Sequence, residues 1–184
     1  MVDFVKELIS CRNKNTQLPF FPDKFKGYTE NELNLIAKKC NLDIHGQFKD
    51  FLLQMGKCSG GLLWDDEFYM YDNKWSSRFV RSQLSEKEDL GYILTNNSKI
   101  DLVGKKLFYL THENETYFYY IITAERDDYI WLLHNADEQG LVKENYTLLE
   151  YLKHHVEQKT KQTQFINFNL KVEKIDRHIT GRLL

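Results

Sequence analysis

Residues 52–72 read LLQMGKCSGGLLWDDEFYMYD, and this stretch decides how the helical first part of the chain leads into the strands that follow. It continues an apolar helical pattern and then places three glycines within six residues, at Gly56, Gly60 and Gly61. A phosphate-binding P-loop follows a strand and opens a helix, whereas here a helix precedes the glycines and a strand is expected after them. We therefore expect the glycines to end the helix and to turn the chain into a sheet through positive φ angles, with anion binding as the minor alternative.

Two helices are expected before this turn. The T-E-N-E sequence at residues 29–32 is a capping box, in which the threonine hydroxyl and the last glutamate each pair with a backbone N–H that the helix leaves free. That helix is expected to end near Asn41, and the next helix covers residues 46–55 with one apolar face. A shorter helix is expected after Asp3, and residues 12–27, which contain both prolines, are expected to form an extended connection.

After the turn, the period of the apolar residues changes from helical to extended. Residues 68–71 are short and aromatic and fit an extended segment. Residues 106–110, 116–123 and 129–134 are rich in Tyr, Phe, Ile and Leu and are separated by polar turns. These three segments are expected to form an antiparallel meander, whereas the sequence of residues 73–92 predicts no definite structure.

The last part of the chain predicts one more helix and one more strand. T-L-L-E at residues 147–150 repeats the capping box and opens a helix that is expected to end near Lys159. Residues 164–175 alternate apolar and polar side chains, which predicts a half-buried strand at a sheet edge or in an exchanged arm. The whole pattern predicts a single α+β domain, with a central antiparallel sheet of about five or six strands and helices packed on one side.

Composition sets the class of protein. The chain has 184 residues, of which 42% are hydrophobic and 28% charged, as expected for one globular core. A net charge of −2 argues weakly against nucleic acid as the partner. Cys11, Cys40 and Cys58 are widely spaced and favour reduced thiols in a cytoplasm over a zinc ribbon or a disulfide framework. No signal peptide and no membrane span of roughly 20 apolar residues is recognised, so we expect a cytoplasmic location without membrane contact.

Residues 29–61, TENELNLIAKKCNLDIHGQFKDFLLQMGKCSGG, resemble the start of the SUKH superfamily, the Syd and Smi/Knr-type homology group. The family pattern there is an acidic helix, a second helix and a glycine-rich turn before the first strand. The resemblance continues through KLFYL, TYFYYIIT and YIWLLHN to the closing helix NYTLLEYLKHHV. It implies a SUKH-like α+β domain over residues 29–158, an N-terminal extension over 1–28 and a C-terminal extension with one strand over 159–184.

The resemblance also implies a function. Bacterial members of this family look like immunity proteins, which neutralise a cognate toxin domain, often a nuclease, by binding it directly. Fungal relatives are regulators of cell-wall synthesis and signalling, so a Smi/Knr-type regulatory or scaffold protein is the alternative. Either role implies a non-catalytic protein-binding domain without cofactor or metal, acting as a monomer or a homodimer.

Charge along the chain suggests where such a partner binds. Residues 113–144 contain eight acidic against two basic side chains, whereas residues 153–182 contain seven basic against three acidic side chains. The simplest interpretation is that these charges solvate turns and a tail. A basic nuclease would instead favour an acidic surface with aromatic anchors. The candidate partner-binding residues are then Trp64, Asp65, Asp66, Glu67, Glu125, Asp127, Asp128, Asp137 and Glu138, with Trp131 nearby and expected in the core.

Catalytic and metal chemistry receive less support. His154 and His155 are adjacent, so they point about 100° apart on a helix and do not form a metal-binding pair. His112 and His134 end two segments that we expect to be adjacent strands, but no third ligand is recognisable. A hydrolase that uses Cys58 and a histidine is the remote alternative, and nothing around Cys58 resembles a nucleophile motif.

Overall fold

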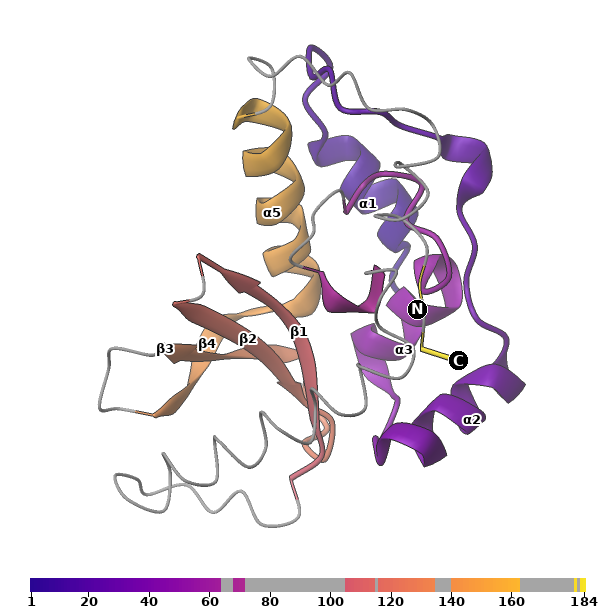
Figure 1. Cartoon of the computed structure of the whole chain (residues 1–184), viewed down its shortest axis with the longest axis vertical. Helices are drawn as coiled ribbons and strands as arrows, with labels where there is room; N and C mark the ends of the chain where they lie inside the picture. The colour runs from indigo at the N-terminus through magenta and orange to yellow at the C-terminus, as the bar shows by residue number, and fades with distance from the viewer. Residues whose placement is uncertain (64–67, 72–104, 115, 135–139, 163–180, 182) are drawn as a thin grey trace.

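The computed structural model describes residues 1–63, 68–71, 105–114, 116–134, 140–162, 181 and 183–184 (Figure 1). None of the helices in these ranges combines the length and the apolar character needed to cross a bilayer. The elements are α1 Phe4–Cys11, the 3-10 helix η1 Pro22–Lys24, α2 Glu30–Cys40, α3 Gly46–Met55, the 3-10 helix η2 Tyr69–Tyr71, β1 Leu107–Glu113, β2 Tyr117–Ile122, β3 Tyr129–His134, β4 Leu141–Thr147 and α5 Leu148–Gln162.

The sheet is an antiparallel meander in the order β1-β2-β3-β4. The predicted α+β class and the three-strand meander are therefore confirmed, but the described residues form four strands rather than five or six. The expected strand at 164–175 and residues 73–92 lie outside the described residues. β4 was not expected, because this edge strand alternates poorly and most of its side chains remain at least partly exposed.

One face of the sheet packs on helices α3 and α5 (Figure 1). Phe48 of α3 and Phe108 of β1 bring their ring centroids to 4.5 Å, and Tyr119 of β2 lies 4.7 Å from Tyr151 of α5. Because side chains alternate along a strand, Tyr109, Tyr120 and Trp131 lie on the opposite face. We call the first face the helix face and the second the far face.

The N-terminal and C-terminal extensions both pack against the central region, residues 29–158. Phe4 and Leu8 of α1 are fully buried, and the Phe4 ring lies 5.6 Å from that of Phe51 in α3. Near the end of α5, the Thr160 hydroxyl accepts a hydrogen bond of 3.1 Å from the backbone N–H of Asn13. The described parts of both extensions thus belong to the same hydrophobic core as the central region.

The helix boundaries follow the predicted caps. Thr29 accepts from the backbone N–H of Glu32 while the Glu32 carboxylate accepts from that of Thr29, so the capping box is complete. α2 ends at Cys40, and its C-cap is Asn41, whose φ of 53° is left-handed as in many C-terminal caps. At the start of α5, Glu150 accepts from the backbone N–H of Thr147 at 2.8 Å.

The glycine turn differs in part from the expectation. Gly60 and Gly61 have φ angles of +60° and +89°, as a sharp turn requires, but Gly56 keeps a helical φ of −61°. Gly56 is needed for space, because a Cβ atom there would lie 2.6 Å from both the Leu52 carbonyl oxygen and the Tyr28 ring.

The prediction of an extended segment at residues 68–71 is also wrong for three of the four residues. Only Phe68 bridges β1, opposite Thr111, and the next three residues form η2. The turn of helix buries Met70 and Tyr71 together with Phe68, and the Tyr71 hydroxyl donates a 2.8 Å hydrogen bond to the carbonyl of Met55. An extended strand would place alternate side chains on opposite sides, so it could not bury all three in this way.

Substitution Gly61→Ala should destabilise the fold. A Cβ atom at Gly61 would lie 2.6 Å from the carbonyl oxygen of Pro19, and its φ is left-handed. We expect the free energy of unfolding to fall by about 1–3 kcal/mol. Leu35→Ala is the control, because Leu35 is 60% exposed on α2. Equal denaturation midpoints for the two variants would contradict this role of Gly61.

The stability of the protein should depend on pH through Glu32. The hydrogen bond from Lys57, followed by that from the Thr29 backbone, lowers the pKa of Glu32 to about 2. A lowered folded-state pKa stabilises the protein above the ordinary glutamate pKa, and this contribution is lost as the pH falls from about 5 toward 2. Glu32→Gln should therefore reduce stability at pH 7 and leave it nearly unchanged near pH 2.

Denaturation at several pH values provides the test. Glu30→Gln is the matched control, because Glu30 is an exposed neighbour whose carboxylate lies 3.0 Å from Lys49 Nζ. If the two variants lose the same stability at every pH, the capping carboxylate is not the source of the dependence.

Candidate partner-binding site

Three of the predicted site residues lie together on the turn between β2 and β3. Glu125, Asp127 and Asp128 are all half-buried there, and Lys105 and Lys143 reach toward them from before β1 and from β4. We call the following group the turn patch, which combines charged side chains with two aromatic rings: Lys105, Glu125, Asp127, Tyr129, Trp131 and Lys143.

Ion pairs connect the charged members of the turn patch. Lys105 Nζ lies 2.7 Å from Glu125 Oε1, and Lys143 Nζ lies 3.6 Å from Glu125 Oε2. Lys143 also donates to the Asp127 carboxylate, and this hydrogen bond is the main reason why the pKa of Lys143 is raised. Each acid of the patch is therefore held by at least one lysine.

The same lysines lie over aromatic rings. Lys143 Nζ is 5.1 Å from the ring centroid of Tyr129 and 5.7 Å from that of Trp131, and Lys105 Nζ is 5.2 Å from Trp131. Trp131 is only 7% exposed, in agreement with its expected place in the core, whereas Tyr129 is 39% exposed. Cation–π contacts of this kind fix the lysine side chains over the rings.

This arrangement changes the electrostatic expectation for the turn. The acids Glu125, Asp127 and Asp128 are balanced by Lys105 and Lys143 and by the exposed Arg126 in the same turn. The described part of the predicted acidic surface is thus close to neutral. A cluster that looks acidic along the sequence becomes balanced because lysines from two other segments fold over it.

Asp128 has a structural role in addition to its predicted one. Its Oδ1 atom accepts a 2.7 Å hydrogen bond from the backbone N–H of Gln47 at the start of α3, where a carboxylate is favoured by the helix dipole. Its backbone carbonyl accepts another, at 2.8 Å, from Leu148 at the start of α5. Asp128 therefore joins two helices to the turn, which the sequence did not reveal because both partners are distant in the chain.

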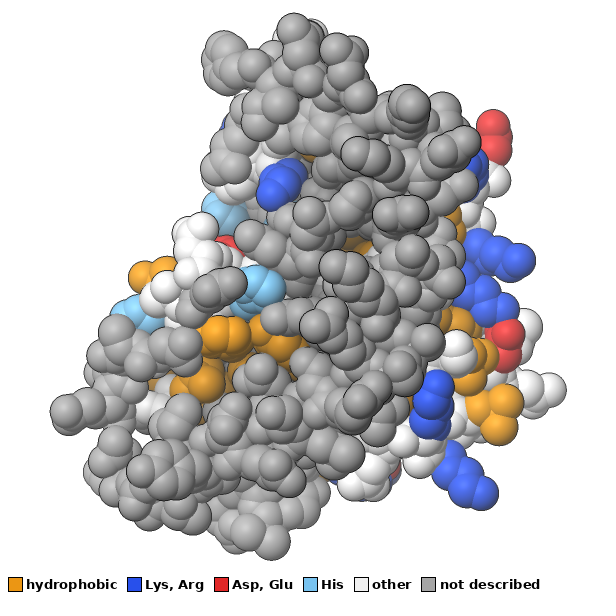
Figure 2. Space-filling view, viewed as in Figure 1, with side chains coloured by type: hydrophobic (Ala, Val, Ile, Leu, Met, Phe, Trp, Pro, Cys, Tyr) orange, Lys and Arg blue, Asp and Glu red, His pale blue; other side chains and the backbone are white. Residues whose placement is uncertain are grey.

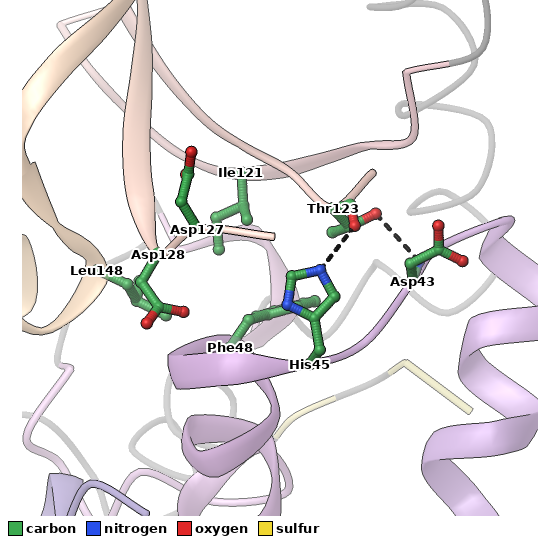
Figure 3. Close-up of a pocket in the computed structure, with 8 residues that line it drawn as sticks. All are labelled: Asp43, His45, Phe48, Ile121, Thr123, Asp127, Asp128 and Leu148. Carbon is green, nitrogen blue, oxygen red and sulfur yellow. Dashed lines mark hydrogen bonds between the residues drawn. The ribbon is translucent and has the colours of Figure 1, made fainter. Parts of the chain in front are cut away.

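A hollow lies beside this junction (Figure 3). Within it the His45 ring donates from Nε2 to the carbonyl of Thr123 at 2.9 Å, and the Thr123 hydroxyl accepts from the backbone N–H of Asp43 at 3.1 Å. The Asp127 carboxylate points away from His45 in the close-up. These hydrogen bonds tie the start of α3 to the end of β2, so we interpret the hollow as a packing junction. It is lined by Asp43, His45, Phe48, Ile121, Thr123, Asp127, Asp128 and Leu148.

The structure does not test the other six predicted site residues. Trp64, Asp65, Asp66, Glu67, Asp137 and Glu138 lie outside the described residues.

The structure separates His112 and His134, which were expected on adjacent strands. β2 lies between β1 and β3, so His112 and His134 are not on adjacent strands, contrary to the expectation. His134 stacks on Tyr117 with ring centroids 4.7 Å apart, whereas His112 faces Phe118 on the opposite side of the sheet. On α5, His155 packs edge-on against Phe68 while His154 is exposed. In the described ranges, no three His, Cys, Asp or Glu side chains are grouped as metal ligands.

Sequence analysis missed a cluster of tyrosines around Glu113. The Tyr151 hydroxyl donates to Glu113 Oε1 at 3.3 Å, and the rings of Tyr119 and Tyr146 lie 4.7 and 6.2 Å from that of Tyr151. Burial, followed by the nearby Glu113 charge, raises the pKa of Tyr119 and Tyr151, so both hydroxyls stay protonated. Four different elements contribute one residue each, and no spacing along the chain could have revealed the cluster.

No protein-family model matches this chain, and neither a curated protein nor a solved structure is significantly similar to it.

Neighbouring aspartates of the turn should differ in their effect on stability. Asp128→Ala removes the acceptor for the Gln47 N–H, so we expect a loss of about 1–2 kcal/mol in the free energy of unfolding. Asp127→Ala removes a surface ion pair with Lys143 and should cost less than about 1 kcal/mol. Urea denaturation measures both, and an equal loss would show that Asp128 does not act as a cap.

Proposed function

We propose that this chain is a non-catalytic protein-binding domain that acts by covering its partner, as a bacterial immunity protein covers a cognate toxin domain. The observation that supports this proposal best is the turn patch, in which exposed Tyr129 and nearly buried Trp131 are surrounded by paired charges. Aromatic side chains at the centre and charged side chains at the rim are typical of protein interfaces.

The geometry of the patch favours specific recognition. Lys143 is held by Asp127 and by two aromatic rings, so its position is fixed before a partner arrives. A preordered surface loses less side-chain entropy on binding than a mobile one does. Since the described turn is balanced in charge, long-range attraction of a basic toxin would depend on the other predicted acids.

Binding to a toxin domain tests the proposal directly. Immunity proteins are expected to be encoded next to their toxin, so the gene next to this one is first examined for a large toxin. Binding of that toxin's C-terminal domain to this chain is then measured by surface plasmon resonance. Tyr129→Ala should weaken binding by about 1–3 kcal/mol, mainly through faster dissociation. Asp127→Lys should slow association, and more so at low salt.

The control for Asp127→Lys is Glu30→Lys. Glu30 also belongs to a surface ion pair, with Lys49 at 3.0 Å, but it lies on α2 rather than on the β2–β3 turn. We expect Glu30→Lys to bind as the unmodified chain does. If both turn variants also bind normally, the turn patch is not the interface. A chain with no toxin neighbour and several weak partners would instead favour the regulatory or scaffold role.

A further inference from the structure

A second surface with exposed aromatic side chains lies on the helix face, at the end of the sheet opposite the turn patch. β1 ends at Glu113, β2 begins at Tyr117 and β3 ends at His134, and the strand register places these residues next to one another. The Tyr117 ring stacks on His134 with centroids 4.7 Å apart, yet Tyr117 is still 38% exposed. Figure 2 shows histidine and hydrophobic side chains gathered on this side of the molecule, beside α5.

Apolar side chains continue this surface across the sheet. Tyr119 lies two residues after Tyr117 and therefore on the same face. It pairs with Leu132 of β3, which in turn pairs with Val142 of β4. Tyr119 is buried against Tyr151 of α5, whereas Leu132 is half-buried and Val142 is 40% exposed. Apolar side chains of the helix face are therefore exposed at this end of the sheet.

Two carboxylates border these apolar side chains. The Tyr151 hydroxyl donates to Glu113 at 3.3 Å, and Glu144 lies on β4 two residues before Tyr146. Burial, followed by the charges of Glu144 and Glu113, raises the pKa of Tyr146, because both carboxylates lie close to its hydroxyl. We call the exposed and half-buried members of this surface the tyrosine patch, which consists of Glu113, Tyr117, Leu132, Val142, Glu144 and Tyr146.

The carboxylates of the tyrosine patch differ from the other half-buried acids of the described ranges. Those other acids pair with lysines or accept hydrogen bonds from backbone N–H groups: Glu7, Glu32, Asp50, Glu125, Asp127 and Asp128. Within the same ranges, no lysine or arginine forms an ion pair with Glu113 or Glu144. Carboxylates that lie close together repel each other, and a cation placed between them removes this repulsion.

We propose that the tyrosine patch is a second contact surface for a protein partner and that it binds an arginine side chain of that partner. A guanidinium group donates two parallel hydrogen bonds to a carboxylate and stacks its flat face on an aromatic ring. Glu113 provides the acceptor, since the Tyr151 hydroxyl occupies one of its roughly four acceptor positions. Tyr117 and Tyr146 provide the rings, and the two apolar members of the patch contact an apolar side chain next to the arginine.

Other ligands fit the tyrosine patch less well. Its two carboxylates repel phosphate groups, which argues against nucleic acid. A lysine ammonium carries the right charge but lacks the flat face that stacks on a ring. The patch is also ordered in advance, because His134 supports the Tyr117 ring and Tyr151 holds the Glu113 carboxylate. Such order lowers the entropic cost of binding a partner.

The tyrosine patch and the turn patch are separate surfaces. β3 begins at Tyr129, in the turn patch, and ends at His134, beside the tyrosine patch, so the two patches lie at opposite ends of the sheet. Trp131 of the turn patch lies on the far face, whereas Tyr117 lies on the helix face. Binding of arginine at the tyrosine patch therefore goes beyond the proposed role of the turn patch and does not depend on it.

Peptide binding tests the proposal without a toxin. The probe is the capped dipeptide acetyl-Arg-Leu-amide, and amide chemical shifts of the full-length chain report where it binds. We expect saturable binding with a dissociation constant of about 1–10 mM, with shift changes centred on residues 112–119, 132–134 and 142–147. Replacing the arginine by citrulline, its uncharged isostere, should weaken binding at least about ten-fold, and replacing it by lysine at least about three-fold.

Variants of the chain locate the site. Glu113→Gln should weaken binding of the arginine peptide at least about five-fold, although it keeps an acceptor for the Tyr151 hydroxyl, and Tyr117→Ala should weaken it about three-fold. Asp23→Asn is the control, because it removes the same charge from an exposed residue of η1 and should leave binding unchanged. Equal binding of the arginine and citrulline peptides, of the arginine and lysine peptides, or of Glu113→Gln and the unmodified chain would overturn the proposal, as would the absence of saturable binding.

Discussion

A close contact between two backbone segments supports most of this structure. Residues 26–28 lie against the end of α3 and the glycine turn, where the backbone N–H of Tyr28 donates to the carbonyl of Leu52 at 2.9 Å and Lys26 bridges Cys58. A Cβ atom at Gly27 would lie 1.5 Å from the Leu53 carbonyl oxygen, so the approach depends on glycine. This contact determines where α2 begins and where α3 ends, and it forms the surface that Leu183 contacts through the Tyr28 hydroxyl.

The position of α3 connects this contact to the candidate site. Its C-terminal end is held by residues 26–28, and its N-terminal end is held by Asp128 of the β2–β3 turn. The turn patch therefore sits on a turn that is anchored to the core. A partner that binds Tyr129 would meet a surface with little freedom to rearrange, and such preorganisation lowers the entropic cost of binding.

The charged side chains show most clearly that folding can overturn a prediction made from neighbouring residues in the sequence. Glu125, Asp127 and Asp128 form an acidic cluster along the chain, which by itself predicts an electrostatic site for a basic partner. In the structure, Lys105 and Lys143 neutralise the first two, and Asp128 caps a helix. Charge density along a sequence counts only local neighbours, whereas the field at a surface includes every side chain that folding brings near it.

The sequence by itself determined the local elements. The capping boxes at 29–32 and 147–150 placed two helix starts, and three aromatic segments specified the meander, since caps and apolar periodicity are local properties. Part of the candidate site was found in the same way, because Glu125 and Asp127 lie in a polar turn between two strands.

Tertiary structure decided what depends on distant neighbours. The polar edge strand β4 is stabilised by its pairing with β3, and residues 69–71 form a 3-10 turn because that conformation buries Met70 and Tyr71. The lysines over Trp131, the tyrosines around Glu113 and the docking of Leu183 likewise join segments that are far apart in the chain. These contacts depend on how the elements pack together, and no pattern within one segment encodes that packing.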